Sequence, residues 1–249
     1  MRVLITRPEP DATALSQLCA QHGIQSYVWP SIAILPARRP QAVHAACQQM
    51  QSTDSVIFVS RHAVQQTCAV LRQDEKRRLA VCRLYAVGKG TAQALHAAGF
   101  SHVVYPKSVS HSEALWGCWL ADGGTSQRVW IFRGQQGREW LGQKLVRHGV
   151  EVHYVPCYQR AASQEGIEAL QAVWQDKPFD LVISTSLDGL QILWASLPEQ
   201  MQCHLQTTRL TVTSEKMLGW ARARGIQHVL RLPGVDNSSI LDTLKEALL

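Results

Sequence analysis

The segment RVWIFRGQQGREWLGQKLVRHGVEVHYVPCYQR, residues 128–160, predicts a strand, a loop with two glycines and two arginines, an amphipathic helix and a second strand. The segment RVLITRPEPDATALSQLCAQHGIQSYVWP, residues 2–30, has the same order of elements. Subtracting the positions gives one constant offset of 126, because 133 − 7, 149 − 23 and 156 − 30 all equal 126. The matched residues are Arg133 with Arg7, Gly149 with Gly23, and Pro156 with Pro30.

The offset continues through the rest of the chain, so the sequence consists of two copies of one unit. Residues 54–60 (DSVIFVS) match residues 180–186 (DLVISTS), and Gly99 matches Gly225. In each copy, short apolar strands alternate with helices, and His-Gly pairs at Gly23 and Gly149 are typical helix ends. Strands that alternate with helices indicate parallel sheets with right-handed crossovers. The predicted class is therefore α/β, with two similar domains that each have a small parallel sheet flanked by helices.

Composition narrows the classes of function. The 249 residues suit two domains of ordinary size, and neither a membrane-spanning apolar run nor a basic-then-apolar leader is present. Seven cysteines without a CxxC pair favour a reducing compartment, so we expect a cytoplasmic protein that has no contact with membranes. The net charge of +6 favours an anionic partner, although 76–78 and Arg38-Arg39 are interpreted as solvated surface and linker. No nucleic-acid-binding signature is found, so a compact, multiply charged anion is the expected ligand.

Several well-known catalytic motifs are absent from the sequence. It contains no P-loop, HExxH, GxSxG or complete GxGxxG, and the GxG at Gly88 lacks the third glycine. The ten histidines are scattered at helix and strand ends without partners at metal-ligand spacing. We therefore expect no cofactor and no metal.

Small hydroxyl residues, arginines and glycines gather where the predicted strands end. Open α/β sheets bind ligands at that edge, beside helix N-termini that present free N–H groups. Alternatively, each Ser or Thr only caps its own helix, and Arg138 with Glu139 is an exposed pair. Gly134 and Gly137 are interpreted as sites of close backbone approach to a ligand. The candidates are Thr6, Arg7, Ser60, Arg61, Gly88 and Thr91 in the first copy, and Arg133, Gly134, Gly137, Arg138, Thr185, Ser186, Thr213 and Ser214 in the second.

Positions that differ between the copies can carry chemistry that is unique to one site. Tyr158 corresponds to Ile32, and Thr91 corresponds to Met217. Only the second copy therefore has a phenol at this place. The alternative is that Tyr158 is an ordinary strand residue with its hydroxyl at the surface.

The order and spacing of these motifs resemble the uroporphyrinogen-III synthase family over essentially the whole chain. The motifs are ITRP (residues 5–8), IFVSRHAV, YAVGKGTAQAL, IFRGQQGRE, VPCYQR and ISTSLDGL, of which IFRGQQGRE followed by a strand tyrosine is the most specific. The resemblance implies an exchange of the first third of each copy between the domains. One domain would comprise 1–35 and 163–249, the other would comprise 39–159, a pair of strands would join them, and the active-site cleft would lie between them.

The resemblance also implies the reaction. The family cyclises the linear tetrapyrrole hydroxymethylbilane, with loss of water and inversion of the last ring, in porphyrin and haem biosynthesis, and uses no cofactor. The many carboxylates of this substrate suit the basic charge balance. Tyr158 matches the family tyrosine that assists hydroxyl departure, while the other candidates would bind carboxylates. The expected oligomeric state is a monomer. The expected partners are the substrate and, as an additional transient partner, the preceding enzyme of the pathway.

One departure and one alternative accompany the resemblance. Residues 212–215 (VTSE) keep the hydroxyls but lack a glycine that many relatives have before them. The alternative function is an inactive two-lobed protein of the same fold that binds or senses a tetrapyrrole or another anion. The product formed from hydroxymethylbilane discriminates between the two.

Overall fold

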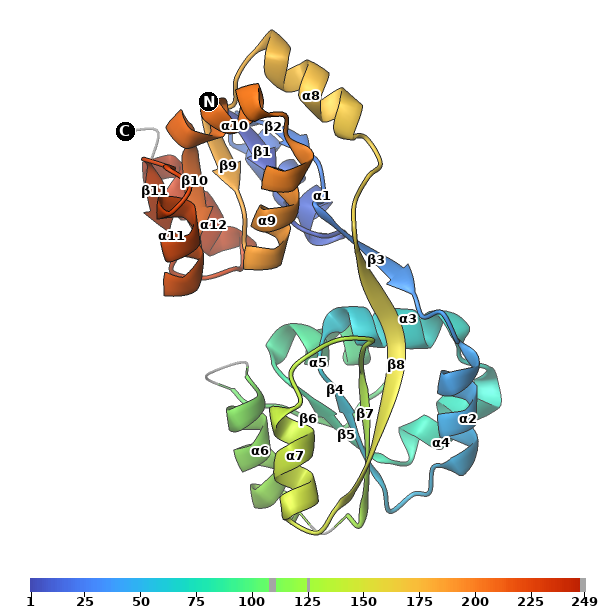
Figure 1. Cartoon of the computed structure of the whole chain (residues 1–249). Coiled ribbons are helices and arrows are strands. Elements are labelled where there is room, and N and C mark those ends of the chain that lie inside the picture. The colour runs from blue at the N-terminus through green and yellow to red at the C-terminus, as the bar shows by residue number, and fades with distance from the viewer. Residues whose placement is uncertain (108–110, 125, 247–249) are drawn as a thin grey trace. The chain divides into compact units, whose positions relative to one another are not determined.

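The computed structural model describes residues 1–107, 111–124 and 126–246. The chain divides into a first unit, Met1–Ala33 with Ala161–Leu249, and a second unit, Ile34–Arg160. Each unit has a twisted, largely parallel sheet with helices on both faces (Figure 1). This architecture confirms the predicted α/β class.

The first unit contains a five-stranded sheet in the order β11-β10-β9-β1-β2, and all of its strand pairs are parallel. Its strands are β1 (Arg2–Ile5), β2 (Gln25–Val28), β9 (Leu181–Ile183), β10 (Arg209–Val212) and β11 (Val229–Arg231). Its helices are α1 (Asp11–Gln21), α8 (Ile167–Asp176), α9 (Leu187–Ser196), α10 (Glu199–Thr207), α11 (Glu215–Arg222) and α12 (Asn237–Glu246).

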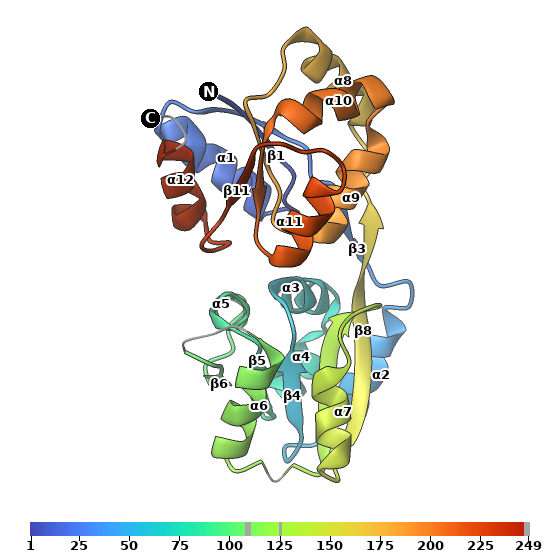
Figure 2. The same ribbon diagram turned by 60° about the vertical axis from the view of Figure 1, so that its left-hand side comes forward.

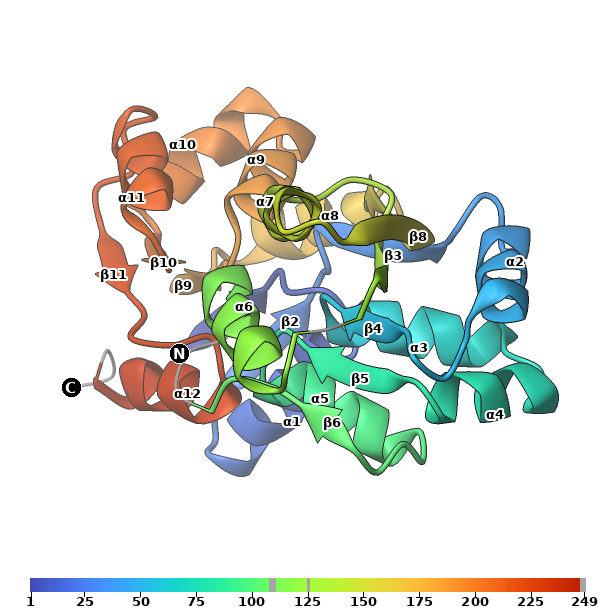
Figure 3. The ribbon, with the colours of Figure 1, turned by 90° about the horizontal axis from the view of Figure 1, so that it is seen from below.

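The second unit is built around a six-stranded sheet in the order β3-β8-β7-β4-β5-β6, in which β6 lies beside β5 at one edge (Figure 3). Its strands are β3 (Ile32–Pro36), β4 (Ser55–Phe58), β5 (Arg83–Ala86), β6 (Val103–Val104), β7 (Arg128–Gly134) and β8 (Glu151–Ala162). Its helices are α2 (Gln41–Gln49), α3 (Arg61–Val70), α4 (Gln73–Ala80), α5 (Lys89–Ala97), α6 (Ser112–Ala121) and α7 (Trp140–Arg147).

The strand that opens each sequence copy pairs with strands of the other copy. In the first unit β1 pairs with β9, with Val3 opposite Leu181. In the second unit β7 pairs with β4, with Val129 opposite Ser55. Since 129 − 126 = 3 and 55 + 126 = 181, the two registers are the same under the sequence offset. The two sheets therefore have equivalent strand registers, as the duplication predicts, although each sheet combines strands from both copies.

A buried carboxylate joins the two copies at the start of the central strands. Asp54 is 2% exposed and accepts hydrogen bonds from the Arg128 Nη2 atom at 2.9 Å and from the Trp130 Nε1 atom at 2.8 Å. In the first unit, Asp180 accepts a hydrogen bond from the backbone N–H of Arg2 at 2.6 Å. Because a buried charge without partners is costly, the bonds of Asp54 stabilise the pairing of strands from different copies, whereas Asp180 is exposed.

Helices cover both faces of each sheet and bury its alternating side chains. In the first unit α1 and α12 lie side by side on one face (Figure 2), while α8–α11 cover the other. In the second unit α6 and α7 cover one face, where Trp119 packs on Ile57 and Tyr85. The opposite face packs against α2–α5. Strands buried on both faces explain the nearly continuous apolar runs in the sequence.

The helix boundaries follow the predicted capping signals. Ser60 and Ser186 are N-caps whose side chains accept hydrogen bonds from the N–H groups of Ala63 and Gly189. The helices α1 and α7 are followed by Gly23 and Gly149, whose φ angles of 70° and 79° lie in the left-handed region. The N-terminal ends of α3 and α9, which carry the positive end of the helix dipole, therefore follow the carboxyl ends of β4 and β9, where candidate residues lie.

Candidate functional site

Tyr158 is oriented by an irregularity in the pairing of β7 and β8. Arg133 lies opposite Pro156, but the next residue, Gly134, lies opposite Tyr158, so Cys157 is the extra residue of a β-bulge. Regular alternation would place Cys157 and Tyr158 on opposite faces of the sheet. With the bulge, both pack into the core beneath α2–α5.

The hydroxyl of Tyr158 is held by a chain of hydrogen bonds. The Ala63 N–H donates to the Ser60 Oγ atom at 3.1 Å, and the Ser60 hydroxyl donates to the Tyr158 phenolic oxygen at 3.2 Å. The phenolic proton is then free to be donated to another group. The chain of hydrogen bonds begins at the N-terminal end of α3 and fixes the position of the Tyr158 hydroxyl.

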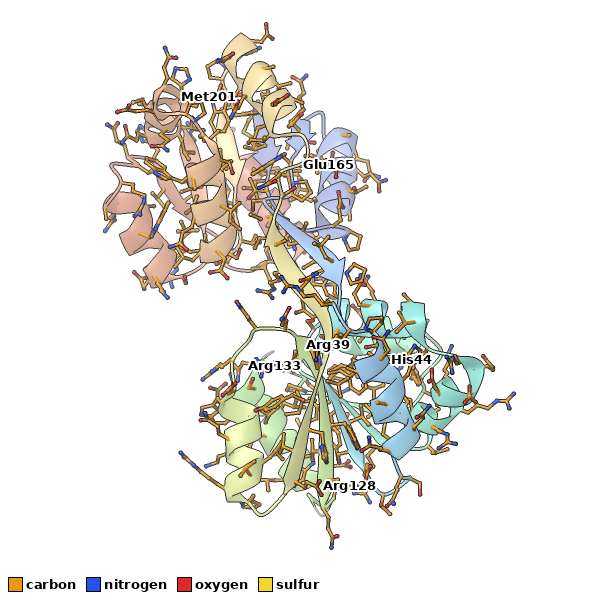
Figure 4. All side chains as sticks on the ribbon, turned by 45° about the vertical axis from the view of Figure 1, so that its right-hand side comes forward. Arg39, His44, Arg128, Arg133, Glu165 and Met201 are labelled. Carbon is orange, nitrogen blue, oxygen red and sulfur yellow. The ribbon has the colours of Figure 1, made fainter. Side chains whose placement is uncertain are left out.

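Tyr158 also lines a cavity of about 330 Å³ within the second unit, together with Ala37, Arg38, Arg39, Gln135 and Pro156. The tyrosine is only 3% exposed, so the cavity reaches a side chain that is otherwise part of the core. In Figure 4, Arg39 and Arg133 lie toward one end of the six-stranded sheet and Arg128 lies toward the other. The cavity therefore lies at the carboxyl end of β7, the edge at which ligands bind to open α/β sheets.

Gly134 and Gly137 leave space that neighbouring side chains of this chain occupy, and close approach of a ligand to their backbone stays a prediction. A Cβ atom on Gly134 would lie 2.9 Å from the Tyr158 Cζ atom. A Cβ atom on Gly137 would lie 2.9 Å from the Arg133 Nη2 atom. Both distances are shorter than van der Waals contact, so these glycines position Tyr158 and Arg133.

Two of the candidate arginines, Arg7 and Arg138, already have hydrogen-bonding partners. Arg7 is 5% exposed, and its guanidinium donates to Asn237 Oδ1 at 2.7 Å and to Asp11 Oδ2 at 3.2 Å. Arg138 is exposed, as the alternative expects, but it pairs with Glu113 rather than with Glu139. Binding of a carboxylate at either arginine would have to compete with these bonds.

Arg133 and Arg61 lie near the cavity end of the second unit. Arg133 is 8% exposed, and its Cζ atom lies 4.9 Å from the centre of the Tyr154 ring, a cation–π contact. Burial raises the pKa of the Tyr154 phenol, although the charge of Arg133 opposes this. Arg61 is half-buried as the first residue of α3.

The hydroxyl candidates lie at strand ends as expected, and most of them have a local structural role. Ser60, Ser186 and Ser214 cap α3, α9 and α11. The Thr213 hydroxyl donates to the Thr185 carbonyl oxygen at 3.2 Å. These three serines therefore cap helices, as the capping alternative expects, and Ser60 also bonds to Tyr158. The remaining hydroxyl candidates are Thr6, which donates to the Ile183 carbonyl oxygen at 2.9 Å, and Thr91, which is 6% exposed in the first turn of α5 after Gly88.

Sequence reasoning did not identify the part that Arg38, Arg39 and Gln135 have in the cavity. Arg38 and Arg39 are exposed, as expected of a solvated linker, but they also line the space next to Tyr158. One available signal was their position between a predicted strand and helix. The approach of 37–39 to β8, however, depends on the pairing of β3 with β8.

Among the residues described, no group of three or more His, Cys, Asp and Glu side chains is arranged to hold a metal ion. The described helices include none that is long and apolar enough to cross a membrane.

Comparisons with known proteins give the same family name for nearly the whole chain. The family model described as uroporphyrinogen-III synthase HemD matches residues 13–240. The uroporphyrinogen-III synthases of Salmonella typhimurium LT2 and Escherichia coli K12 are 32% and 30% identical to this chain, over 98% of this chain and 100% of each relative. The crystal structure of the synthetase from Helicobacter pylori 26695 matches with a TM-score of 0.65 and 15% identity, and covers 100% of both chains, which demonstrates similarity of fold.

Proposed function

The chain belongs to the uroporphyrinogen-III synthase family, and from this premise we propose that it cyclises hydroxymethylbilane to uroporphyrinogen III. The reaction loses water and inverts the last pyrrole ring, which makes the enzyme a cyclising hydro-lyase. The enzymatic activity itself follows from the family and from the named relatives. The reaction class and the roles of individual residues are the proposal.

Tyr158 is proposed to assist the departure of the hydroxyl group. The carbon–oxygen bond breaks with its electron pair going to oxygen, which takes the phenolic proton and leaves as water. The lone pair of the pyrrole nitrogen stabilises the carbon that remains. The substituted carbon of the last ring then attacks this carbon, and a spiro intermediate forms. The observation that carries this role is the hydrogen bond from Ser60 to the Tyr158 oxygen, because it leaves the phenolic proton available for donation.

Most of the catalysis is proposed to come from orientation of the substrate. Left alone, the activated bilane closes head to tail without inversion, so the enzyme must hold the chain in a curled conformation. Hydroxyls and helix N-termini at the carboxyl edge of each sheet are suited to bind carboxylates. We assign this role to Thr91 in the second unit and to Thr185, Ser186, Thr213 and Ser214 in the first.

Product analysis tests the function directly. The full chain is incubated with enzymatically generated hydroxymethylbilane, and the oxidised products are separated into type I and type III isomers. We expect mainly type III isomer. Type I isomer alone, as in the reaction without the protein, would refute the synthase and leave the inactive binding protein as the explanation.

A cytoplasmic, monomeric enzyme that needs no cofactor is also proposed. All seven cysteines are free thiols, which supports a reducing compartment. The measurement for the cofactor is activity after exhaustive dialysis against a chelator, which should leave the rate unchanged. The mass in solution, measured by light scattering, tests the monomer.

A further inference from the structure

The cavity beside Tyr158 has the charge and chemistry of an anion site. Arg38 and Arg39 line it, and its other lining residues are Ala37, Gln135, Pro156 and Tyr158. Two positive charges are thus present without a carboxylate among the lining residues. An anionic ligand would gain charge-assisted hydrogen bonds here without displacing an acidic neighbour.

Both arginines have donors available for a ligand. Arg38 uses its Nε atom to donate to the Gln159 Oε1 atom at 3.3 Å, and this bond orients the guanidinium. Neither arginine forms an ion pair with any residue in the described ranges. Arg39 immediately precedes the N-terminal end of α2, whose first turn contains no acidic residue. The helix end adds to the positive potential at this place.

The cavity is too small for a whole linear tetrapyrrole. Its volume of about 330 Å³ is at the lower end for small-molecule sites, which range from about 300 to 1,000 Å³. One pyrrole ring with its two acidic side chains is of a suitable size. Pro156 and the Tyr158 ring supply apolar surface for the flat ring, and Gln135 is held near them because its backbone N–H donates to the Tyr158 carbonyl oxygen at 2.8 Å.

We propose that this cavity is the subsite for the pyrrole ring that carries the leaving hydroxyl, and that Arg38 and Arg39 bind the acetate and propionate of that ring. The proposal rests on the proposed function, because it combines the position of the arginines with the role of Tyr158. Arg38 and Arg39 are then specificity-determining residues, since they fix the reacting ring next to the proton donor.

A binding experiment tests the subsite without turnover. The probe is a single pyrrole that bears one acetate and one propionate, titrated into the full chain and followed by ligand-observed NMR. We expect weak, millimolar binding to the wild type and about tenfold weaker binding to Arg38→Gln and to Arg39→Gln, as loss of one charge-assisted bond implies. The dimethyl ester of the probe lacks both charges, so it should bind to the wild type more weakly than the acid binds to either single variant.

A matched control separates the subsite from general charge effects. Arg77 is an exposed residue of α4 in the same unit, and Arg77→Gln removes the same charge away from the cavity. It should bind the probe as the wild type does. The proposal would be overturned if all three variants lost the same affinity for the probe. It would also be overturned if Arg38→Gln and Arg39→Gln lost none. Equal binding of the acid and its ester would likewise overturn it.

Kinetics extend the test and separate its failure from failure of the proposed function. Arg38→Gln and Arg39→Gln should raise KM for hydroxymethylbilane about tenfold with little change in kcat, because the interaction is made in both ground and transition states. Tyr158→Phe should bind the probe normally while turnover is lost. If type III product forms but the arginine variants have normal KM, the subsite is wrong and the function stands. If no type III product forms, the function itself fails.

Discussion

The hydroxyl of Ser60 donates a hydrogen bond of 3.2 Å to the phenolic oxygen of Tyr158, which lies 98 residues further along the chain. The same serine caps α3, so the bond connects the positive end of a helix to the proposed proton donor. In the proposed mechanism, this bond leaves the phenolic proton of Tyr158 available for the departing hydroxyl.

Replacing Tyr158 by Phe should lower kcat by about 100-fold or more, because general acids contribute about 10²–10⁴-fold to rate. The substitution keeps the buried ring, so the melting temperature should change little. Stopped-time assays with isomer separation measure the loss. Tyr27→Phe, in β2, is the matched control and should remain active; undiminished turnover in Tyr158→Phe would remove this residue from the mechanism.

Replacing Gly134 by Ala should lower turnover about tenfold or more, since the new Cβ atom would lie 2.9 Å from the Tyr158 Cζ atom and would displace the ring. Gly134 does not have a positive φ angle, so the backbone accepts alanine. Gly117 in α6 has open space around its Cα, and Gly117→Ala is the control. Should both variants have wild-type kcat, the position of the phenol does not depend on Gly134.

Replacing Asp54 by Ala should reduce the free energy of unfolding by about 3 kcal/mol, because it removes one partner of a buried ion pair. The lower end of the usual range is expected because the Arg128 side chain is 25% exposed and regains some water. Urea titration followed by tryptophan fluorescence measures the change. Asp74→Asn on the surface of α4 should cost less than about 1 kcal/mol; a similar loss in both would argue against the role of Asp54.

The stabilising effect of Glu75 should disappear in acid. Burial raises the pKa of its carboxyl, but the backbone N–H of Arg72 and the His44 ring outweigh this effect and hold the pKa below the ordinary value of 4.5. A carboxyl with a depressed pKa stabilises the fold above its unfolded pKa and loses this effect as the pH falls through the folded pKa. Glu75→Gln should therefore be less stable than the wild type near pH 6, and the difference should shrink below about pH 4.5. Glu168→Gln, at an exposed position, should show a constant small difference in the same denaturation series.

Alkylation should distinguish the buried thiols from the exposed one. Burial raises the pKa of Cys157 to about 11 and that of Cys47 to about 12, so few thiolates form at pH 8. Cys203 is exposed and should react first with iodoacetamide. Peptide mass spectrometry after a short exposure measures the order, and turnover should be unaffected by labelling of Cys203. Early labelling of Cys157 would mean that the strand around the bulge opens readily.

The sequence by itself determined the elements and most of their boundaries, because local signals specify them. The constant offset of 126 between the copies predicted matching strands and helices, and the structure confirms them down to the serine caps and the glycines at helix ends. These features are local, because each depends on a hydrogen bond between residues a few positions apart or on the backbone angles of a single glycine. The tyrosine at position 158 was also conspicuous, as only one copy has a phenol there.

Only the tertiary structure decided how these elements combine into a site. The pairing of β1 with β9 and of β7 with β4 depends on strand edges that no local pattern distinguishes, since both copies have compatible registers. The bulge at Cys157, which turns Tyr158 toward Ser60, and the approach of Arg38 and Arg39 to the same cavity arise from contacts between segments distant in sequence. Local physics therefore specified the parts, whereas long-range strand pairing and packing specified which side chains meet.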